Sequence, residues 1–431
     1  QDPVKENGGW TLEMIDPRNP CGGITNWKAS VHPAGGTPGR RNSVDGGNPD
    51  NIPPELIRIY ATDSVTLMAV FNEPLDSVTA TVPSNYKIND TSPVSLFMSG
   101  PVFNIVEIKL ASPLQKNIVY ELVATGIKDC KGNIIGVHNR AKAGLSSKVE
   151  PSDLVINEIL FNPRPSQYDY VELYNNSNKI IDGNSIYIAN RNAVGAISSS
   201  HALSSVPYFI YPGEYLVVTQ SASALQMGYF VQKPGSIMTI SSMPSYPDDK
   251  GIVVITNEQQ EVIDEVSYSE DWHFGLLDNK EGVALERVNP SGSSNQSNNW
   301  HSASTSVGYG TPTYRNSQYM LEDLSNAKIE VTPKIFSPDN DGYNDIATIS
   351  YHLDTTGYMA NVMVFDAQGR IIRRLVKNDL AGYSGKWTWD GFGENHERLA
   401  IGTYIVYTEF FNLQGKRRTF KNSVVLARRL N

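Results

Sequence analysis

The residues best placed to do chemistry lie in one acidic run near the C-terminal end of the sequence. Asp339, Asp341 and Asp345 surround Gly342 in the order Asp-Asn-Asp-Gly-Tyr-Asn-Asp. Oxygen ligands folded about a turn are what Ca²⁺ prefers, and carboxylates this close repel one another unless a cation or solvent separates them. The run predicts a calcium site. The alternative is a turn whose acidic side chains bond the local backbone.

A second set of residues invites a catalytic interpretation. Glu158 and Glu172 could form a carboxylate pair for acid–base work, but each alternates with apolar neighbours, so we interpret both as solvent-facing strand positions. The seven histidines are scattered and pair neither with one another nor with cysteine, which leaves a zinc site or a Cys/His nucleophile without support. We find no Gly-x-Ser-x-Gly elbow and no phosphate-binding loop before a helix. The sequence therefore predicts no catalytic residues.

The cysteine count bears on the compartment. Cys21 and Cys130 both lie in turn-like surroundings rich in Asn, Gly and Asp. In an oxidising compartment, one disulfide between adjoining domains is the first interpretation. Two unrelated free thiols are the alternative, since sequence alone does not show that the sulfur atoms approach each other.

Tryptophans raise the question of carbohydrate binding. Trp27 and Trp300 recur in an internal repeat, and Trp387 and Trp389 alternate along one predicted strand. Exposed aromatic rings can stack on sugars, but large aromatic side chains at such positions more often pack in a core or at a corner. We expect packing here.

The whole composition describes a folded, turn-rich protein. The chain has 431 residues, 40% of them hydrophobic and 19% charged, with 34 Gly and 25 Pro. This length is too great for one ordinary core and predicts about three domains. The net charge of −9 argues against nucleic acid as a partner, because phosphate binding needs a basic face. No run of about 18 apolar residues predicts a transmembrane segment.

Short strand-like runs are found along most of the chain. They are rich in β-branched and aromatic residues, as in 65–71, 215–219 and 404–408, and Gly, Pro, Asn and Asp separate them. This pattern is typical of β-sandwiches, and no longer segment carries a helical period. The predicted fold class is all-β, with linkers at 45–54, 148–152 and about 318–328.

One segment occurs twice. Residues 9–44 and 282–318 align, and Trp27 and Trp300 each stand 18 residues after the leading Gly. Agreement at fixed spacing indicates a repeated structural unit. The second copy closes a long strand-rich region, whereas little sequence precedes the first copy. We therefore expect the chain to begin inside a domain, and the full gene product to be longer.

Motifs between residues 52 and 318 resemble two known families. Residues 52–149 resemble bacterial Ig-like modules of surface and S-layer proteins, through Ala69-Val-Phe-Asn-Glu-Pro-Leu-Asp76 and Asn85-Tyr-Lys-Ile88. Residues 152–318 resemble a lamin-tail domain, through Ile156-Asn-Glu-Ile-Leu160, Tyr170-Val-Glu-Leu-Tyr-Asn175 and the closing Asn299-Trp300. With the repeat, this resemblance implies that residues 1–44 are the C-terminal remnant of another lamin-tail domain.

The last segment resembles a third family. Residues 327–431 resemble the flagellar-hook-cap-like Ig fold, through Phe336-Ser-Pro-Asp-Asn-Asp-Gly, Trp389-Asp-Gly391 and Ile401-Gly-Thr-Tyr404. Related terminal domains act as type IX secretion signals, so the resemblance implies a sorting role. The chain as a whole is thus expected to be a series of tandem Ig-like β-sandwich domains.

These patterns favour a non-enzymatic structural or adhesion protein that is extracytoplasmic, at the cell surface, associated with the outer membrane or secreted. Its expected partners are other surface or outer-membrane proteins, with glycans as a further class, and one form of this role is that of a subunit of an outer-membrane assembly. One alternative is a carbohydrate-binding accessory protein. Another is a set of spacer and sorting domains from a larger secreted hydrolase. Sandwich folds host many functions, so the sequence names no single partner.

Overall fold

The computed structural model describes residues 5, 8–19, 21–320 and 327–428. Within these ranges the fold is all-β, which confirms the predicted class. The α-helices are the short α1 (Ser77–Ala80) and α2 (Ala222–Gly228), and no described helix has the length and apolar character needed to cross a membrane. The sequence predicts that the chain begins inside a domain, but residues 1–4 lie outside the described part. Residues 321–326 of the expected linker also lie outside it.

The chain divides into two compact units, Gln1–Ser147 and Lys148–Asn431. The break falls at the expected linker 148–152. The strands of the first unit are β1 (Leu12–Met14), β2 (Trp27–Ala29), β3 (Leu56–Asp63), β4 (Thr66–Phe71), β5 (Tyr86–Ile88), β6 (Ser95–Ser99), β7 (Ile105–Lys109), β8 (Tyr120–Ala124) and β9 (Arg140–Ala143).

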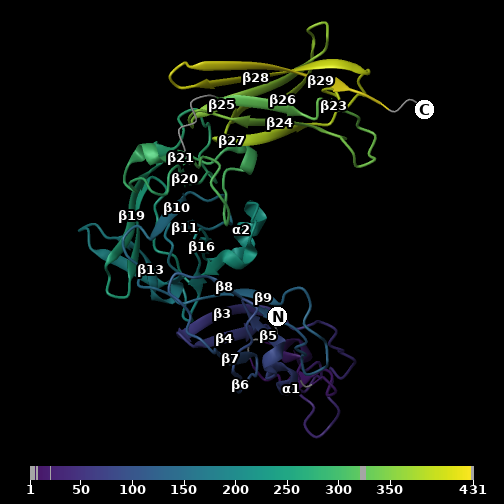
Figure 1. The fold of residues 1–431 in the computed structure, drawn as a ribbon, viewed down its shortest axis with the longest axis vertical. Helices are drawn as coiled ribbons and strands as arrows, with labels where there is room; N and C mark the ends of the chain where they lie inside the picture. The colour runs from purple at the N-terminus through teal and green to yellow at the C-terminus, as the bar shows by residue number, and fades with distance from the viewer. Residues whose placement is uncertain (1–4, 6–7, 20, 321–326, 429–431) are drawn as a thin grey trace. The chain divides into compact units, whose positions relative to one another are not determined.

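Strands β3 to β9 form two sheets around one core (Figure 1). The sheet orders are β3-β4-β7-β6 and β5-β8-β9. Alternate residues of β4, such as Leu67, Ala69 and Phe71, are buried between the sheets, as the period of two along a strand requires. Strands β1 and β2 pair only with each other, so this hairpin stands apart from the two sheets.

The second unit begins with a larger sandwich. Its strands are β10 (Leu154–Leu160), β11 (Tyr170–Asn175), β12 (Ile181–Asp182), β13 (Ile186–Arg191), β14 (Ile197–Ala202), β15 (Phe209–Ile210), β16 (Tyr215–Thr219), β17 (Ile237–Thr239), β18 (Lys250–Asn257), β19 (Val262–Ser269), β20 (Leu285–Arg287) and β21 (Trp300–Ser302). The main sheets have the orders β17-β16-β11-β10-β20-β21 and β14-β13-β18-β19.

The six-stranded sheet is covered on both faces. One face packs against the four-stranded sheet through residues such as Ile156 and Leu173. The other carries a second apolar cluster that includes Leu160, Val217 and Leu225 of α2. Every residue of β10 is therefore buried. A central strand covered on both faces has no side exposed to solvent, so any charged residue on it is buried.

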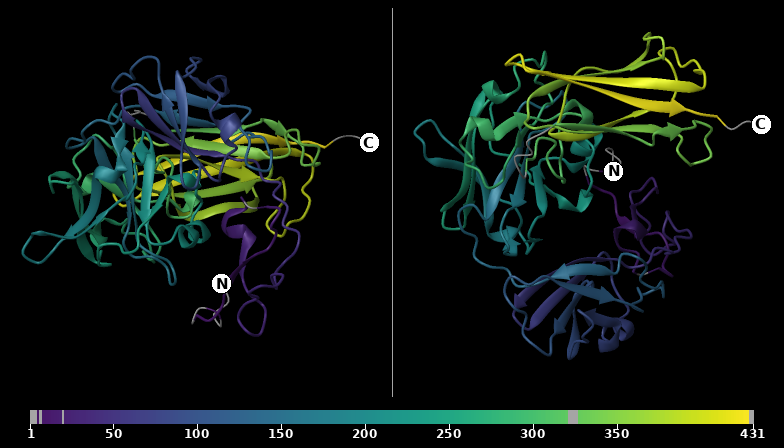
Figure 2. Two further views of the ribbon diagram at one scale, coloured as in Figure 1. Left: turned by 90° about the horizontal axis from the view of Figure 1, so that it is seen from below. Right: turned by 45° about the horizontal axis from the view of Figure 1, so that its top comes forward.

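The last part of the second unit is another sandwich. Figure 2 shows its two layers, coloured green to yellow, facing each other. Its strands are β22 (Lys328–Thr332), β23 (Ile335–Phe336), β24 (Ala347–His352), β25 (Tyr358–Phe365), β26 (Ile371–Leu380), β27 (Ser384–Trp389), β28 (Gly402–Asn412) and β29 (Arg417–Leu426). The sheet orders are β22-β24-β27 and β23-β29-β28-β25-β26, and Trp389 lies fully buried between them.

The two sandwiches of the second unit are joined by direct contacts. Phe274 packs with Met359 and Leu380 in a small buried cluster. The Tyr383 amide donates to the Ser317 carbonyl at 2.9 Å, and a Cβ on Gly382 would lie 2.6 Å from that same carbonyl oxygen. Glycine at position 382 is what allows this close approach of the two backbones.

Candidate functional site

The predicted calcium ligands do lie together in the turn between β23 and β24. Ligand oxygens of Asp339, Asp341 and Asp345 lie within 4.8 Å of one another. Asp345 accepts the backbone amides of Asn340 at 2.7 Å and Gly342 at 2.9 Å, and Asp341 accepts that of Tyr343 at 2.8 Å. The carboxylates thus bond the local backbone, as the alternative interpretation expects, and calcium binding stays a prediction.

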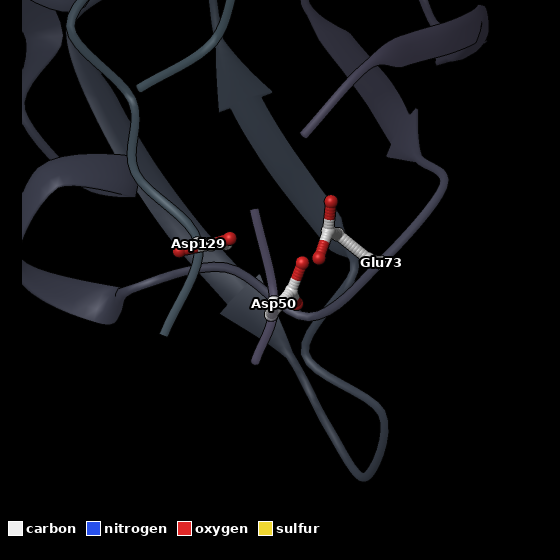
Figure 3. Close-up of side chains that lie close together, drawn as sticks. All are labelled: Asp50, Glu73 and Asp129. Carbon is white, nitrogen blue, oxygen red and sulfur yellow. The ribbon is translucent and has the colours of Figure 1, made fainter. Parts of the chain in front are cut away.

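A second acidic cluster was missed in the sequence. Asp50, Glu73 and Asp129 come from three separate segments of the first unit (Figure 3). Burial, together with the nearby charges of Asp50 and Asp129, raises the pKa of Glu73 to about 7. Both carboxylate oxygens of Asp129 already accept hydrogen bonds, one from the Lys131 amide at 2.7 Å and the other from the Asn133 side chain at 2.6 Å. Residues so far apart in sequence carry no local motif that could have identified this cluster.

The predicted cysteine pair lies next to this second cluster. The sulfur atoms of Cys21 and Cys130 are 2.02 Å apart and the Cα atoms 6.3 Å apart. The link connects the segment that carries the β1–β2 hairpin to the loop after β8, within the first unit. It joins the two parts of that unit that share no sheet.

The carboxylates with the most unusual environment form a row inside the six-stranded sheet. Glu172, Glu158 and Glu286 lie on the adjacent strands β11, β10 and β20, and Glu158 stands directly opposite each of the others. All three are completely buried. The interpretation of Glu158 and Glu172 as solvent-facing is therefore wrong. The alternation was real, but the second face of the sheet is covered as well.

Hydrogen-bond donors surround this row. Glu158 accepts from the Tyr170 hydroxyl at 2.7 Å and the Thr311 amide at 2.9 Å. Glu172 accepts from the Asn157 side chain at 2.8 Å. Glu286 accepts from the Ser317 hydroxyl and the Gln318 amide, both at 2.8 Å. These bonds tie the closing segment after β21 to the central strands of the sheet.

The Thr311 hydroxyl bridges two of these carboxyls. It lies 2.9 Å from Glu158 Oε2 and 2.9 Å from Glu286 Oε1, yet a hydroxyl has one proton to donate. A protonated carboxyl on one side would let that glutamate donate to the hydroxyl while the hydroxyl donates to the other. Burial, reinforced by the charge of Glu286, raises the pKa of Glu158 to about 8, and burial also raises the pKa of Glu172 and Glu286.

Catalysis by this row has no geometric support. A general acid must come within hydrogen-bond reach of a substrate, whereas these three side chains have no exposed surface. Buried polar groups that are fully bonded specify one packing of a core. The row is thus a structural element that fixes the closing segment 311–318 onto the sheet.

The first copy of the repeat contains the same bonding scheme. Glu13, the counterpart of Glu286, accepts from the Thr37 and Ser43 hydroxyls, both at 2.7 Å. Burial raises the pKa of Glu13, but these hydrogen bonds together outweigh burial and lower the pKa to about 2. The leading glycines Gly9 and Gly282 both have positive φ angles, 80° and 73°, a conformation that favours glycine. The repeat is therefore a repeat in three dimensions.

The copies differ in what covers them. Leu285 is buried and Trp300 is 3% exposed, since β20 also pairs with β10. Their counterparts Leu12 and Trp27 are 69% and 45% exposed. The expectation that these tryptophans pack in a core is confirmed for Trp300 and Trp389 and is wrong for Trp27. Trp27 lies on β2, whose partner β1 has no second neighbouring strand among the described residues, whereas β20, the partner strand of Trp300, also pairs with β10.

Comparison with known proteins leaves the family open. No protein-family model matches the sequence, and no curated protein matches it. A DUF4876 family protein from Bacteroides thetaiotaomicron matches 55% of this chain over 86% of its own, with 14% identity and a TM-score of 0.23. The N-terminal part of the bacterial S-layer protein SbsC matches 51% of this chain over 44% of its own, with 17% identity and a TM-score of 0.21.

A tetra-tandem repeat from the extending region of a large adhesion protein also matches. It covers 86% of this chain and 73% of its own, with 11% identity and a TM-score of 0.16. The chain spans less than half of the S-layer structure named above. Likenesses with TM-scores of 0.16 to 0.23 show neither the family nor the function of this chain.

Proposed function

We propose that this chain is a non-enzymatic structural or adhesion component of a bacterial cell surface that works through contacts with other surface proteins. The observation that carries the proposal is the role of its buried carboxylates. The most perturbed acids, Glu158, Glu172 and Glu286, lie inside a core and bond the segment that closes it. They support an architecture of consecutive sandwiches and offer no surface to a substrate.

The Cys21–Cys130 link supports placement outside the cytoplasm. Disulfides persist in oxidising compartments and are rare in the cytosol. The tandem sandwiches also fit a surface role, since such folds present loops for binding on a rigid scaffold. The resemblance of residues 327–431 to terminal sorting domains leads us to propose that this part directs export, and that the protein joins an outer-membrane assembly.

Protease treatment of intact cells tests the surface location. We expect an added protease to cleave the native protein on whole cells while a periplasmic marker stays intact. Deleting residues 327–431 should then leave the protein protected inside the cell, since the sorting domain is gone. Protection of the native protein would contradict surface placement. Normal exposure of the deletion variant would contradict the sorting role alone.

A further inference from the structure

The second unit contains a polar cleft that the proposed function does not use. Its volume is about 620 Å³, and it lies where the closing segment after β21 meets strands β24 and β27. Its lining includes Ser306, Arg315, Ser317, Tyr319, His352 and Lys386. The contacts that join the two sandwiches, such as that between Tyr383 and Ser317, hold its walls together.

The charge of this cleft is opposite to that of the chain. Arg315 and Lys386 are both exposed, and no Asp or Glu is among the lining residues that the structure describes. The chain as a whole carries a net charge of −9. Neither cation takes part in an ion pair within the described ranges. Two such cations without a protein carboxylate favour a ligand that brings its own negative charge.

Aromatic rings adjoin the cations. The Arg315 guanidinium lies over the Tyr319 ring, 5.6 Å from its centroid. Outside the cleft lining, the rings of Tyr174 and Tyr215 contact each other at a tilt of 37°, with their centroids 4.8 Å apart. Burial raises the pKa of Tyr215, and the nearby charge of Arg315 opposes that rise, which places the cation beside this tyrosine pair. Hydroxyl groups of Ser306 and Ser384, with the Tyr319 ring, complete a lining of ring, hydroxyls and positive charge.

We propose that this cleft binds an acidic saccharide, a sugar chain whose units carry carboxylates. Arginine recognises a carboxylate through two parallel hydrogen bonds, serine hydroxyls can bond sugar hydroxyls, and tyrosine presents an apolar ring with a polar tip to the sugar face. The inference deepens the proposed adhesive function and rests on it for the encounter with extracellular polysaccharide.

The alternative of single-stranded nucleic acid fits the cleft less well. Aromatic rings and cations also bind such strands. However, tracking a phosphate backbone requires a row of cations, and affinity depends on how many phosphates are neutralised. The two cations of this cleft, on a chain of net charge −9, can neutralise one or two carboxylates but not the many phosphates of a nucleic-acid strand.

Isothermal titration calorimetry of the full chain tests the proposal, with trigalacturonate as the acidic probe and a neutral galactose trisaccharide as its match. We expect trigalacturonate to bind at least tenfold more tightly than the neutral sugar. Arg315→Gln and Lys386→Gln should each weaken binding at least tenfold, and the double variant should abolish it. The control is Arg374→Gln with Lys377→Gln, because both cations are exposed and lie outside the cleft lining. This double variant should bind trigalacturonate as tightly as the native chain.

Several results would overturn the proposal. One is that trigalacturonate fails to bind, and another is that the neutral sugar binds as tightly as trigalacturonate does. A third is that the Arg374 and Lys377 control variant loses as much affinity as the cleft variants. The last is that a short single-stranded oligonucleotide displaces trigalacturonate at a lower concentration than trigalacturonate itself requires. Surface location is measured separately by protease treatment. A chain that is exposed on cells and fails to bind trigalacturonate contradicts this inference and leaves the proposed function standing.

Discussion

At the scale of single residues, the glutamate row explains how a charged residue can be part of a sandwich core. Like charges directly opposite each other on neighbouring strands destabilise a sheet. Glu158 faces Glu172 on one side and Glu286 on the other, so the row is tolerable only because donors surround it and at least one carboxyl is protonated. This makes the closing of the sandwich sensitive to pH.

The first prediction concerns that sensitivity. Burial raises the pKa of Glu158 from 4.5 to about 8. A raised pKa in the folded state means that the stabilisation is complete below the unfolded-state pKa and is lost as the pH rises through the folded-state value. The free energy of unfolding should therefore fall between about pH 4.5 and 8. One such proton corresponds to a slope of about 1.4 kcal/mol per pH unit.

Glu158→Gln should reduce this slope, because the amide can donate to the Thr311 hydroxyl without losing a proton. Glu172 and Glu286 keep their own raised pKa values. Urea unfolding of the second unit, followed at several pH values, is the measurement. Glu258→Gln, an exposed residue in the turn after β18, is the matched control and should keep the slope. An unchanged slope in Glu158→Gln would show that Glu158 does not titrate between these pH values.

The second prediction concerns calcium. Extracellular calcium modules bind with dissociation constants of about 10⁻⁴ to 10⁻³ M, so 10 mM calcium should stabilise the last sandwich by about 1–3 kcal/mol. Asp339→Asn with Asp341→Asn should remove the effect in thermal unfolding, while Asp345, which holds the turn, is left in place. Magnesium at the same concentration is the control. An equal shift with both ions, or none with calcium, would reduce the run to a simple turn.

At the scale of elements, the sequence predicted strands well and their environments less well. The run 215–219 matches β16 in both bounds, and 65–71 and 404–408 fall on β4 and β28. Alternation finds a strand, because side chains point to opposite faces in turn. It does not say whether the second face meets water or another layer, and this is why the burial of Glu158 was missed.

The repeated hairpin shows the same limit. Its turn bonds are local and recur in both copies, as with Glu13 and Glu286. The covering of the hairpin is not local, because it depends on strand β10, which starts at Leu154, well before β20. The sequence therefore indicated the repeat but not the different exposure of Trp27 and Trp300.

That difference gives the third prediction. Trp300→Ala should lower the free energy of unfolding of the second unit by about 3–5 kcal/mol, as expected for a large buried aromatic side chain. Trp27→Ala is the matched control in the other copy, and its effect on the first unit should stay within about 0.5 kcal/mol, as for most surface changes. Chemical unfolding of the full chain measures both. Equal losses would contradict the different coverage of the two hairpins.

At the scale of the whole molecule, the expected order of domains remains a proposal, although the structure has separate cores in 56–143, 149–300 and 331–426. The linker at 148–152 was visible in the sequence because Pro and charged residues replace the strand pattern there. Interactions between distant segments, such as the Asp50–Glu73–Asp129 cluster and the cleft beside Arg315, carry no local signal and required the fold.

The fourth prediction concerns the link between Cys21 and Cys130. A closed loop of about 100 residues stabilises a folded protein by up to about 5 kcal/mol, and the separation here is 109 residues. Cys130→Ser should therefore lower the thermal midpoint of the first unit, and reducing agent should have the same effect on the native chain and none on the variant. Titration of two free thiols in the native, unreduced protein would contradict the link.

The central claim is that this chain acts at the cell surface by holding other proteins. Purification of the native protein from source membranes, with mass spectrometry of the intact chain and of everything that elutes with it, tests this most directly. We predict a stoichiometric surface or outer-membrane partner and no catalytic domain on the same polypeptide. A chain that elutes alone and carries an upstream hydrolase domain would contradict the claim and reduce these sandwiches to spacers.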